Sequence, residues 1–227
     1  MKILLIEPYY TGSHKQWADG FQRSSRHEIR ILSMKGQFWK WRMHGGAITL
    51  AKEFNENDWC PDLILATDML DLTTFLSLTR ERSHNIPTAI YFHENQLSYP
   101  WSPDDRDIKN KRDTHYGFIN YSSALSADKV LFNSEFHMRS FLNELQPFLK
   151  QFPDHQELGS IDNIYNKSKV LYLGMELQCF DKHKIDNPNE RPLILWNHRW
   201  EYDKNPELFF SVLEKLKNSC IDFSLAV

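Results

Sequence analysis

Short apolar runs recur along the chain, and longer stretches with apolar residues at every third or fourth position separate them. The runs predict strands and the longer stretches predict amphipathic helices. We expect strands at residues 2–7, 29–33, 63–67, 88–92, 129–132 and 169–173, and helices at 14–23, 47–55, 72–82, 111–126 and 135–149. This alternation is typical of α/β proteins, and we predict a Rossmann-like, doubly wound parallel sheet.

The pattern is interrupted and then restarts near residue 190. Residues 181–192 are polar and contain Pro188 between two asparagines, which indicates a linker. An apolar run at 193–196, a helix at 207–218 opened by Pro206, and an apolar run at 223–227 follow. We divide the chain into a Rossmann-like domain at 1–180, a linker at 181–192 and the start of a second Rossmann-like domain at 193–227. About two strands are too few for a stable domain, so we expect a fragment, or a partner that completes it.

The composition is that of an ordinary globular protein, with 227 residues, 41% hydrophobic and 25% charged. The first apolar run is cut short by Glu7 and Pro8, so it is neither a signal peptide nor a membrane span, and we expect a cytoplasmic protein. Cys60, Cys179 and Cys220 fit neither a disulfide framework nor a metal-binding pair. We predict that all three are reduced, buried thiols.

Two strand-to-helix turns carry groups suited to phosphate. Arg199 and Lys204 lie between the strand at 193–196 and Pro206, where a strand end and a helix N-terminus favour an anion. After the first strand, Gly12 and Ser13 allow backbone N–H groups to approach a phosphate. That turn has one glycine where the dinucleotide fingerprint needs three, and an ordinary turn with Ser13 as helix N-cap remains the alternative.

Polar residues also follow two other predicted strands. His93, Glu94, Asn95 and Gln96 come directly after the strand at 88–92, where α/β sites collect polar groups, although a lone histidine is more often structural. They are not an HExxH zinc motif, which needs a second histidine one turn later. Ser134 is predicted to cap the helix at 135–149. Gly174 is predicted to supply a positive-φ turn after the strand at 169–173.

A net charge of −3 gives the whole molecule no attraction for nucleic acid, so any such contact needs a local patch. Residues 35–44 interleave Trp39 and Trp41 with lysine and arginine, and residues 106–112 are also basic. Stacking rings and cations are what single-stranded RNA requires. The alternative for both stretches is a solvated loop, which is also our interpretation of the acidic residues 104–107.

Four segments together resemble the tRNA-queuosine mannosyltransferase family, a branch of the retaining GT-B glycosyltransferases. They are EPYYTGSHKQWADGF at 7–21, FHENQLSYPW at 92–101, LGMEL at 173–177 and WNHRWEYDKNPE at 196–207. The resemblance spans the chain, but the two-glutamate donor motif of the family lies beyond residue 227. It implies transfer of mannose from GDP-mannose to queuosine in the anticodon of an aspartate tRNA.

The resemblance also implies roles for the residues already named. His93 and Glu94 would be catalytic, with His93 positioning the sugar or acceptor and Glu94 orienting that histidine or contacting a hydroxyl. Gly12, Ser13, Arg199 and Lys204 would bind the donor phosphates. The sugar and acceptor residues would be His14, Asn95, Gln96, Trp39 and Trp41. We expect no metal and no cofactor beyond the nucleotide-sugar.

Three classes of function compete. The first is a nucleotide-sugar-dependent glycosyltransferase, including one with a different sugar or acceptor. The second is a tRNA-binding or assembly module without catalysis. The third, a nucleotide-linked oxidoreductase, fails because the glycine fingerprint and the ribose-binding acid after the second strand are missing.

Overall fold

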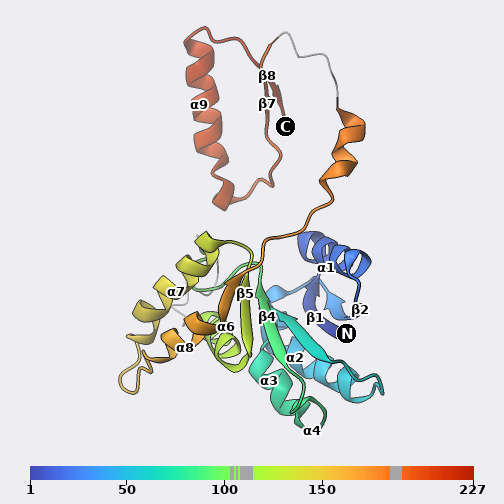
Figure 1. Cartoon of the computed structure of the whole chain (residues 1–227). Coiled ribbons are helices and arrows are strands. Elements are labelled where there is room, and N and C mark those ends of the chain that lie inside the picture. The colour runs from blue at the N-terminus through green and yellow to red at the C-terminus, as the bar shows by residue number, and fades with distance from the viewer. Residues whose placement is uncertain (103–104, 106, 108–114, 185–190) are drawn as a thin grey trace. The chain divides into compact units, whose positions relative to one another are not determined.

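The computed structural model describes residues 1–102, 105, 107, 115–184 and 191–227, which form two compact units. The first unit comprises Met1–Tyr99 and Asp113–Glu176, and the second comprises Pro100–Arg112 and Leu177–Val227. Each unit is described by itself below (Figure 1).

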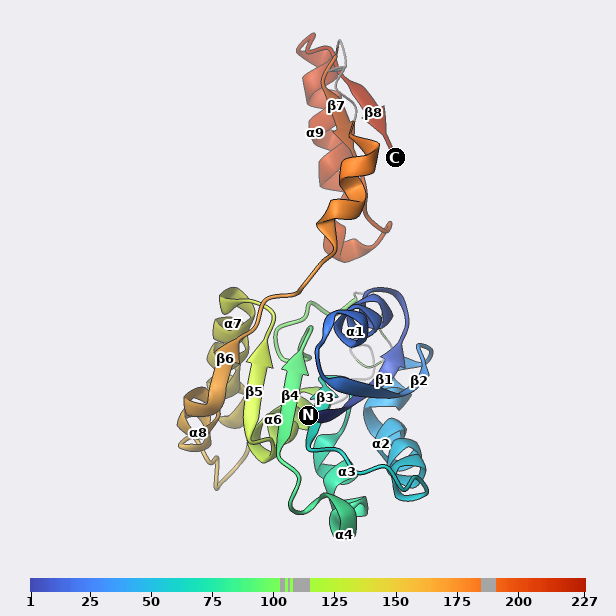
Figure 2. The ribbon, with the colours of Figure 1, turned by 45° about the vertical axis from the view of Figure 1, so that its right-hand side comes forward.

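A parallel sheet of six strands forms the centre of the first unit. The strands are β1 (Lys2–Tyr10), β2 (Glu28–Lys35), β3 (Leu63–Thr67), β4 (Thr88–Phe92), β5 (Lys129–Phe132) and β6 (Ser168–Val170). Their spatial order is β2-β1-β3-β4-β5-β6, as Figure 2 shows. All pairs are parallel, which confirms the predicted α/β, Rossmann-like fold.

Helices cover both faces of this sheet. They are α1 (Gly12–Ser24), α2 (Trp39–Asn55), α3 (Leu72–Leu78), α4 (Arg80–Ser83), α6 (His115–Ser126), α7 (Glu135–Leu149) and α8 (Ser160–Lys167). Alternate residues of each strand face opposite sides. Leu4 and Ile6 join the larger core with α2, α3, α6, α7 and α8. Ile3 and Leu5 join a smaller core with α1.

The strand order places a reversal of chain direction at β1. The chain passes from β1 to β2 on one side and then returns to β3 on the other side of β1. In open α/β sheets, ligands bind beyond the carboxyl ends of the strands at such a switch point. The strand order therefore locates the candidate site at the ends of β1 and β3.

The second unit contains a smaller parallel pair of strands. Its elements are η1 (Leu177–His183), β7 (Leu193–Leu195), η2 (Tyr202–Lys204), α9 (Pro206–Asn218) and β8 (Ser224–Ala226). The ring of Trp196 is buried against Phe209, with ring centroids 4.6 Å apart. Throughout the described parts of both units, every helix is too short or too polar to cross a membrane.

Several boundaries differ from those predicted. Helix α2 begins at Trp39 rather than at residue 47, because residues 39–46 bury Met43 and two glycines within the first unit. Thr79 separates α3 from α4, and its hydroxyl bonds to the carbonyl oxygen of Phe75. The polar helix α8 was not predicted. Strand β6 covers Ser168–Val170 and does not extend to residue 173.

Some local predictions were also wrong. Ser13 is not the N-cap of α1: the helix begins at Gly12 (φ 51°), and Thr11 occupies the cap position without a side-chain hydrogen bond. Gly174 has no positive φ. All three cysteines are exposed rather than buried. Ser134 does cap α7, since its hydroxyl oxygen accepts a hydrogen bond from the backbone N–H of His137.

Candidate active site at the ends of β1, β3 and β4

Polar side chains from three neighbouring strands meet at the switch point. Glu7 comes from β1, which is irregular between Glu7 and Tyr10, where Pro8 has no N–H to donate to the ladder. Asp68 follows β3 and His93 follows β4. His14 joins them from the first turn of α1. The parallel order brings these residues together although they are far apart in sequence.

Asp68 holds both the backbone and the ring of His93. Its Oδ1 accepts hydrogen bonds from the backbone N–H of His93 at 2.8 Å and from ring Nδ1 at 3.3 Å. Burial alone would raise the pKa of Asp68. The hydrogen bonds from His93 and the charges of His93 and His14 outweigh burial and bring this pKa below its usual value. Asp68 is therefore an ionised, buried acceptor.

The imidazole of His93 is packed on several sides. Its centroid lies 4.5 Å from the ring of Trp17, 4.5 Å from that of His14 and 4.9 Å from that of Tyr91. With Nδ1 bonded to Asp68, the second nitrogen, Nε2, is buried and has no partner among the described residues. A buried polar atom without a partner is costly. Nε2 is thus the clearest attachment point for a ligand hydroxyl.

Glu7 and His14 form a buried ion pair beside this ring. Oε2 of the fully buried Glu7 lies 3.0 Å from Nδ1 of His14, and its Oε1 accepts a hydrogen bond from the backbone N–H of Tyr9. Burial of the imidazole lowers the pKa of His14. The hydrogen bond and charge of Glu7, with the charges of Asp68 and Glu94, more than reverse this effect and raise the pKa to about 9. At neutral pH His14 is a cation in the first turn of α1.

Among the described residues, Glu7, His14 and His93 also have donor atoms that all lie within 4.8 Å of one another. This is a set that a metal ion could use. A proton already holds His14 to Glu7, and a metal at that nitrogen would have to displace it.

Comparison with known proteins decides the family. Residues 2–175 match the family model described as tRNA-queuosine alpha-mannosyltransferase N-terminal. The chain belongs to the tRNA-queuosine alpha-mannosyltransferase family. A curated tRNA-queuosine alpha-mannosyltransferase from Drosophila melanogaster is 35% identical over 234 residues, covering 99% of this chain. The chain spans 60% of the length of that relative.

In this family member, the residues that follow His93 form the turn after β4. Asn95 is buried, and its Oδ1 accepts hydrogen bonds from the backbone N–H groups of Leu97 and Ser98. Gln96 donates to the Glu94 carboxylate at 3.1 Å. The carboxylate that orients His93 is Asp68, a role that the sequence interpretation offered to Glu94.

The two predicted phosphate-binding cations lie in the second unit, in the loop from β7 to α9. Arg199 is exposed, with the nearest Glu201 oxygen 3.9 Å away. Lys204 Nζ donates to Asp203 Oδ2 at 2.7 Å, and this bond lowers the pKa of Asp203. Asn205, in the left-handed region, accepts a hydrogen bond from Leu208 N–H and caps α9. Both cations therefore lie at a strand end and helix N-terminus, where the sequence predicted them.

The two tryptophans of the predicted RNA patch have different environments. Trp39 is half-buried, with its ring centroid 5.2 Å from that of Tyr116, whereas Trp41 is exposed. Both belong to helix α2 and not to a loop. The second basic stretch, 106–112, lies outside the described residues apart from residue 107.

Sequence reasoning missed Glu7, Asp68 and Asn120. The side-chain amide of Asn120 donates to the Asp68 carbonyl oxygen, and its own oxygen accepts from Gln96 N–H. Asp68 follows its strand as His93 follows the next one, so the same strand-end rule could have found it. Glu7 is a lone acid within an apolar run, which is a further available signal.

Proposed function

We propose that this chain is the acceptor-side part of a retaining glycosyltransferase that moves mannose from GDP-mannose to queuosine in the anticodon of tRNA-Asp. Membership of the family supports the reaction class. The observation that carries the assignment of the site is the buried Nε2 of His93, which has no hydrogen-bond partner within the described part of the chain while Nδ1 is held by Asp68.

Each charged group has a task in such a transfer. Breaking the bond between sugar and diphosphate develops negative charge on the leaving phosphate, so fixed positive charge there lowers the barrier most. Arg199 supplies planar, bidentate geometry and Lys204 supplies a point charge. The backbone N–H groups of Gly12 and Ser13, at the N-terminus of α1, and the His14 cation offer further anion contacts.

His93 would bind a hydroxyl group of the sugar. The hydrogen bond from Nδ1 to Asp68 fixes the orientation of the ring, so Nε2 is the ring nitrogen left to form a hydrogen bond with the hydroxyl group. The group therefore orients the sugar and does not act as its nucleophile. The proposal includes no metal, because fixed cations supply the charge that a metal would otherwise provide.

A non-catalytic tRNA-binding module is the second candidate. The observation in its favour is the stretch at residues 35–44, which interleaves tryptophan with lysine and arginine. A glycosyltransferase with another sugar or acceptor is the third. These alternatives differ in whether GDP binds and in which sugar is transferred.

The test is transfer of radiolabelled mannose from GDP-mannose to tRNA that carries queuosine. It uses the chain and, in parallel, a longer protein in which a complete second Rossmann-like unit follows it. His93→Ala should lower kcat while GDP affinity, measured by calorimetry, stays within about twofold. The exposed His84→Ala is the matched control. Absence of GDP binding and of mannose transfer in both proteins would refute the proposal and leave the other two candidates.

A further inference from the structure

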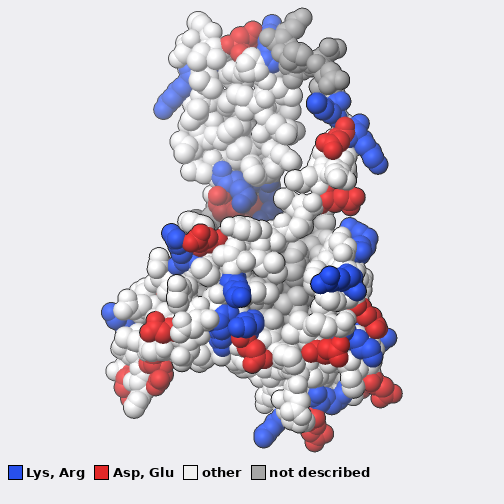
Figure 3. Space-filling model, in the orientation of Figure 1, with Lys and Arg blue, Asp and Glu red and all other residues white. Residues whose placement is uncertain are grey.

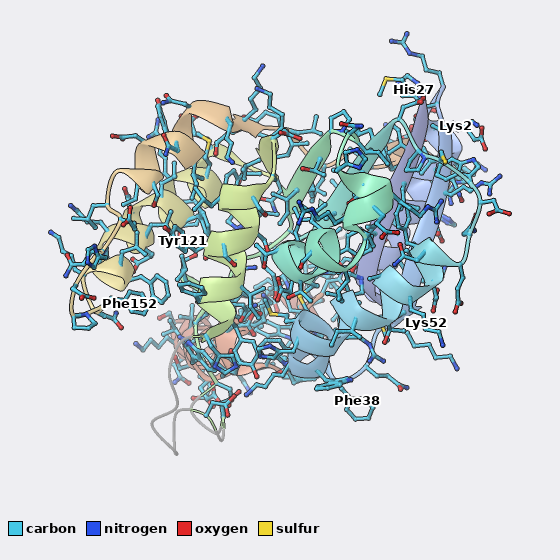
Figure 4. The ribbon with its side chains drawn as sticks, turned by 90° about the horizontal axis from the view of Figure 1, so that it is seen from below. Lys2, His27, Phe38, Lys52, Tyr121 and Phe152 are labelled. Atoms are coloured by element: carbon cyan, nitrogen blue, oxygen red, sulfur yellow. The ribbon has the colours of Figure 1, made fainter. Side chains whose placement is uncertain are left out.

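The start of helix α2 holds an aromatic ring in solvent at the expense of backbone strain. Phe38, the residue before the helix, has φ 54° and ψ 56°, the left-handed region that disfavours bulky side chains. Its side chain is 76% exposed, and Figure 4 shows Phe38 at the rim of the molecule. Glycine or asparagine would fit this backbone better. A strained and exposed phenylalanine is more readily explained by contact with a ligand than by packing.

A second exposed ring lies one turn further along the helix. The backbone N–H of Trp41 bonds to the carbonyl oxygen of Phe38, and the Trp41 side chain is 62% exposed. Its indole lies against Gly45, where an added Cβ would come within 2.6 Å of the ring. Ile48 is also exposed and continues the same helical face. Phe38 and Trp41 are called the aromatic stripe below.

The segment that carries the aromatic stripe is basic in sequence. Residues 35–52 contain four cations and no carboxylate, in a chain whose net charge is −3, and one of the four, Lys52, lies 3.9 Å from Glu56. By contrast, Figure 3 shows both signs interspersed over the visible face of the first unit. Lys35 is exposed, and the Arg42 side chain is held beside it by a hydrogen bond from Nε to the Lys35 carbonyl oxygen at 3.0 Å. The partner that this charge favours is a polyanion.

The segment that leads to the aromatic stripe touches the candidate active site. Lys35 pairs with Tyr10 in the β1–β2 register. The next residue, Gly36, approaches Thr11 so closely that an added Cβ would lie 2.1 Å from the Thr11 methyl group. Thr11 directly precedes Gly12, where α1 begins. A strand of nucleotides on the aromatic stripe would therefore begin beside the turn that carries His14.

We propose that Phe38 and Trp41 stack unpaired bases of an RNA loop while Lys35 and Arg42 bind its phosphates. Stacking on aromatic rings accepts any base, and neighbouring cations follow the backbone. Duplex RNA hides its base faces and cannot use the rings. The identity of that loop as an anticodon rests on the proposed function, whereas the preference for unpaired RNA does not.

The experiment measures binding of a fluorescein-labelled RNA hairpin with an unpaired loop, and of a duplex of equal charge, by fluorescence anisotropy at fixed salt. Trp41→Ala and Phe38→Gly should each weaken hairpin binding about five- to a hundredfold and leave duplex binding unchanged. Phe38→Gly should also raise the melting temperature, because glycine relieves the strained backbone. Tyr165→Ala, which removes an exposed ring from α8, is the matched control.

Three results would overturn the proposal. The first is hairpin affinity equal to wild type in both variants; the second is a lower melting temperature for Phe38→Gly, which would make the ring structural. Sedimentation tests the competing occupant, a second copy of the chain. A dimer that Trp41→Ala dissociates without changing RNA affinity would also contradict the proposal. Mannose transfer is measured in parallel on the same variants. If transfer persists while hairpin binding is unchanged, this proposal fails and the proposed function stands.

Discussion

The Glu7–His14 pair makes the stability of the first unit depend on pH. The pKa of His14 is about 9 in the folded protein against an ordinary value of 6.5. The folded state therefore holds this proton more tightly than the unfolded state. The stabilisation is fully present below pH 6.5 and is lost as the pH rises through about 9.

The size of the effect follows from the difference between the two pKa values. Each pKa unit corresponds to about 1.4 kcal/mol, so the pair contributes at most roughly 3 kcal/mol to the free energy of unfolding. Solvent screening removes little of this, because the side chains of His14 and Glu7 are only 12% and 0% exposed. For a chain of this size, a loss of that order lowers the melting temperature by roughly 5–10 °C.

The assay is urea unfolding followed by circular dichroism at about pH 6 and about pH 9.5. The free energy of unfolding of the wild type should fall by up to roughly 3 kcal/mol between these conditions. His14→Gln should be less stable at the lower pH and should lack this part of the slope. His84→Gln, at an exposed histidine, should retain the wild-type slope. Equal slopes in the wild type and His14→Gln would refute the reasoning.

Three further predictions concern the Arg199 and Lys204 cations, the Asp68 carboxylate that orients the His93 ring, and a close backbone contact. Arg199→Ala or Lys204→Ala should lower mannose transfer about a hundredfold, since one lost contact to a developing anion costs about 3 kcal/mol; normal turnover in both would remove the diphosphate role. Asp68→Asn should lower kcat at least about tenfold in steady-state assays and leave GDP affinity intact in calorimetry, and the reverse pattern would contradict it. Gly36→Ala should lower the free energy of unfolding by about 1–3 kcal/mol, because the added Cβ has no space. Gly174→Ala, where the surroundings are open, should leave that free energy unchanged, and urea unfolding measures both.

The sheet could be predicted because each strand is a compact apolar run. The predictions for β3, β4 and β5 match the observed bounds. The start of α2 could not be found in this way, because Gly36 and the alternating rings and cations after it resemble a loop. Helix α8 has a short polar sequence and is held by Ile164 packing into the larger core, a tertiary contact that local pattern does not reveal.

The sequence predicts those site residues that directly follow an apolar strand, because sites in α/β proteins lie at the carboxyl ends of strands. His93 is predicted in this way, and Asp68, which has the same position after β3, could have been predicted by the same rule. The pairing of Glu7 with His14 depends on how α1 returns over the end of β1, which one sequence pattern does not specify. Whether a cysteine such as Cys60 is buried or exposed likewise depends on tertiary structure.

The packing around His93 has a consequence for how tightly a hydroxyl group can be held. Asp68 fixes the ring and backbone nitrogens, and the Asn133 amide donates to the His93 carbonyl oxygen at 2.8 Å. Aromatic rings flank the imidazole itself. An immobile side chain has little rotational entropy left to lose, which otherwise costs about 0.5–1.5 kcal/mol on binding. The His93 side chain has already lost this entropy when the protein folds, so a hydrogen bond to Nε2 can contribute nearly its whole free energy to affinity.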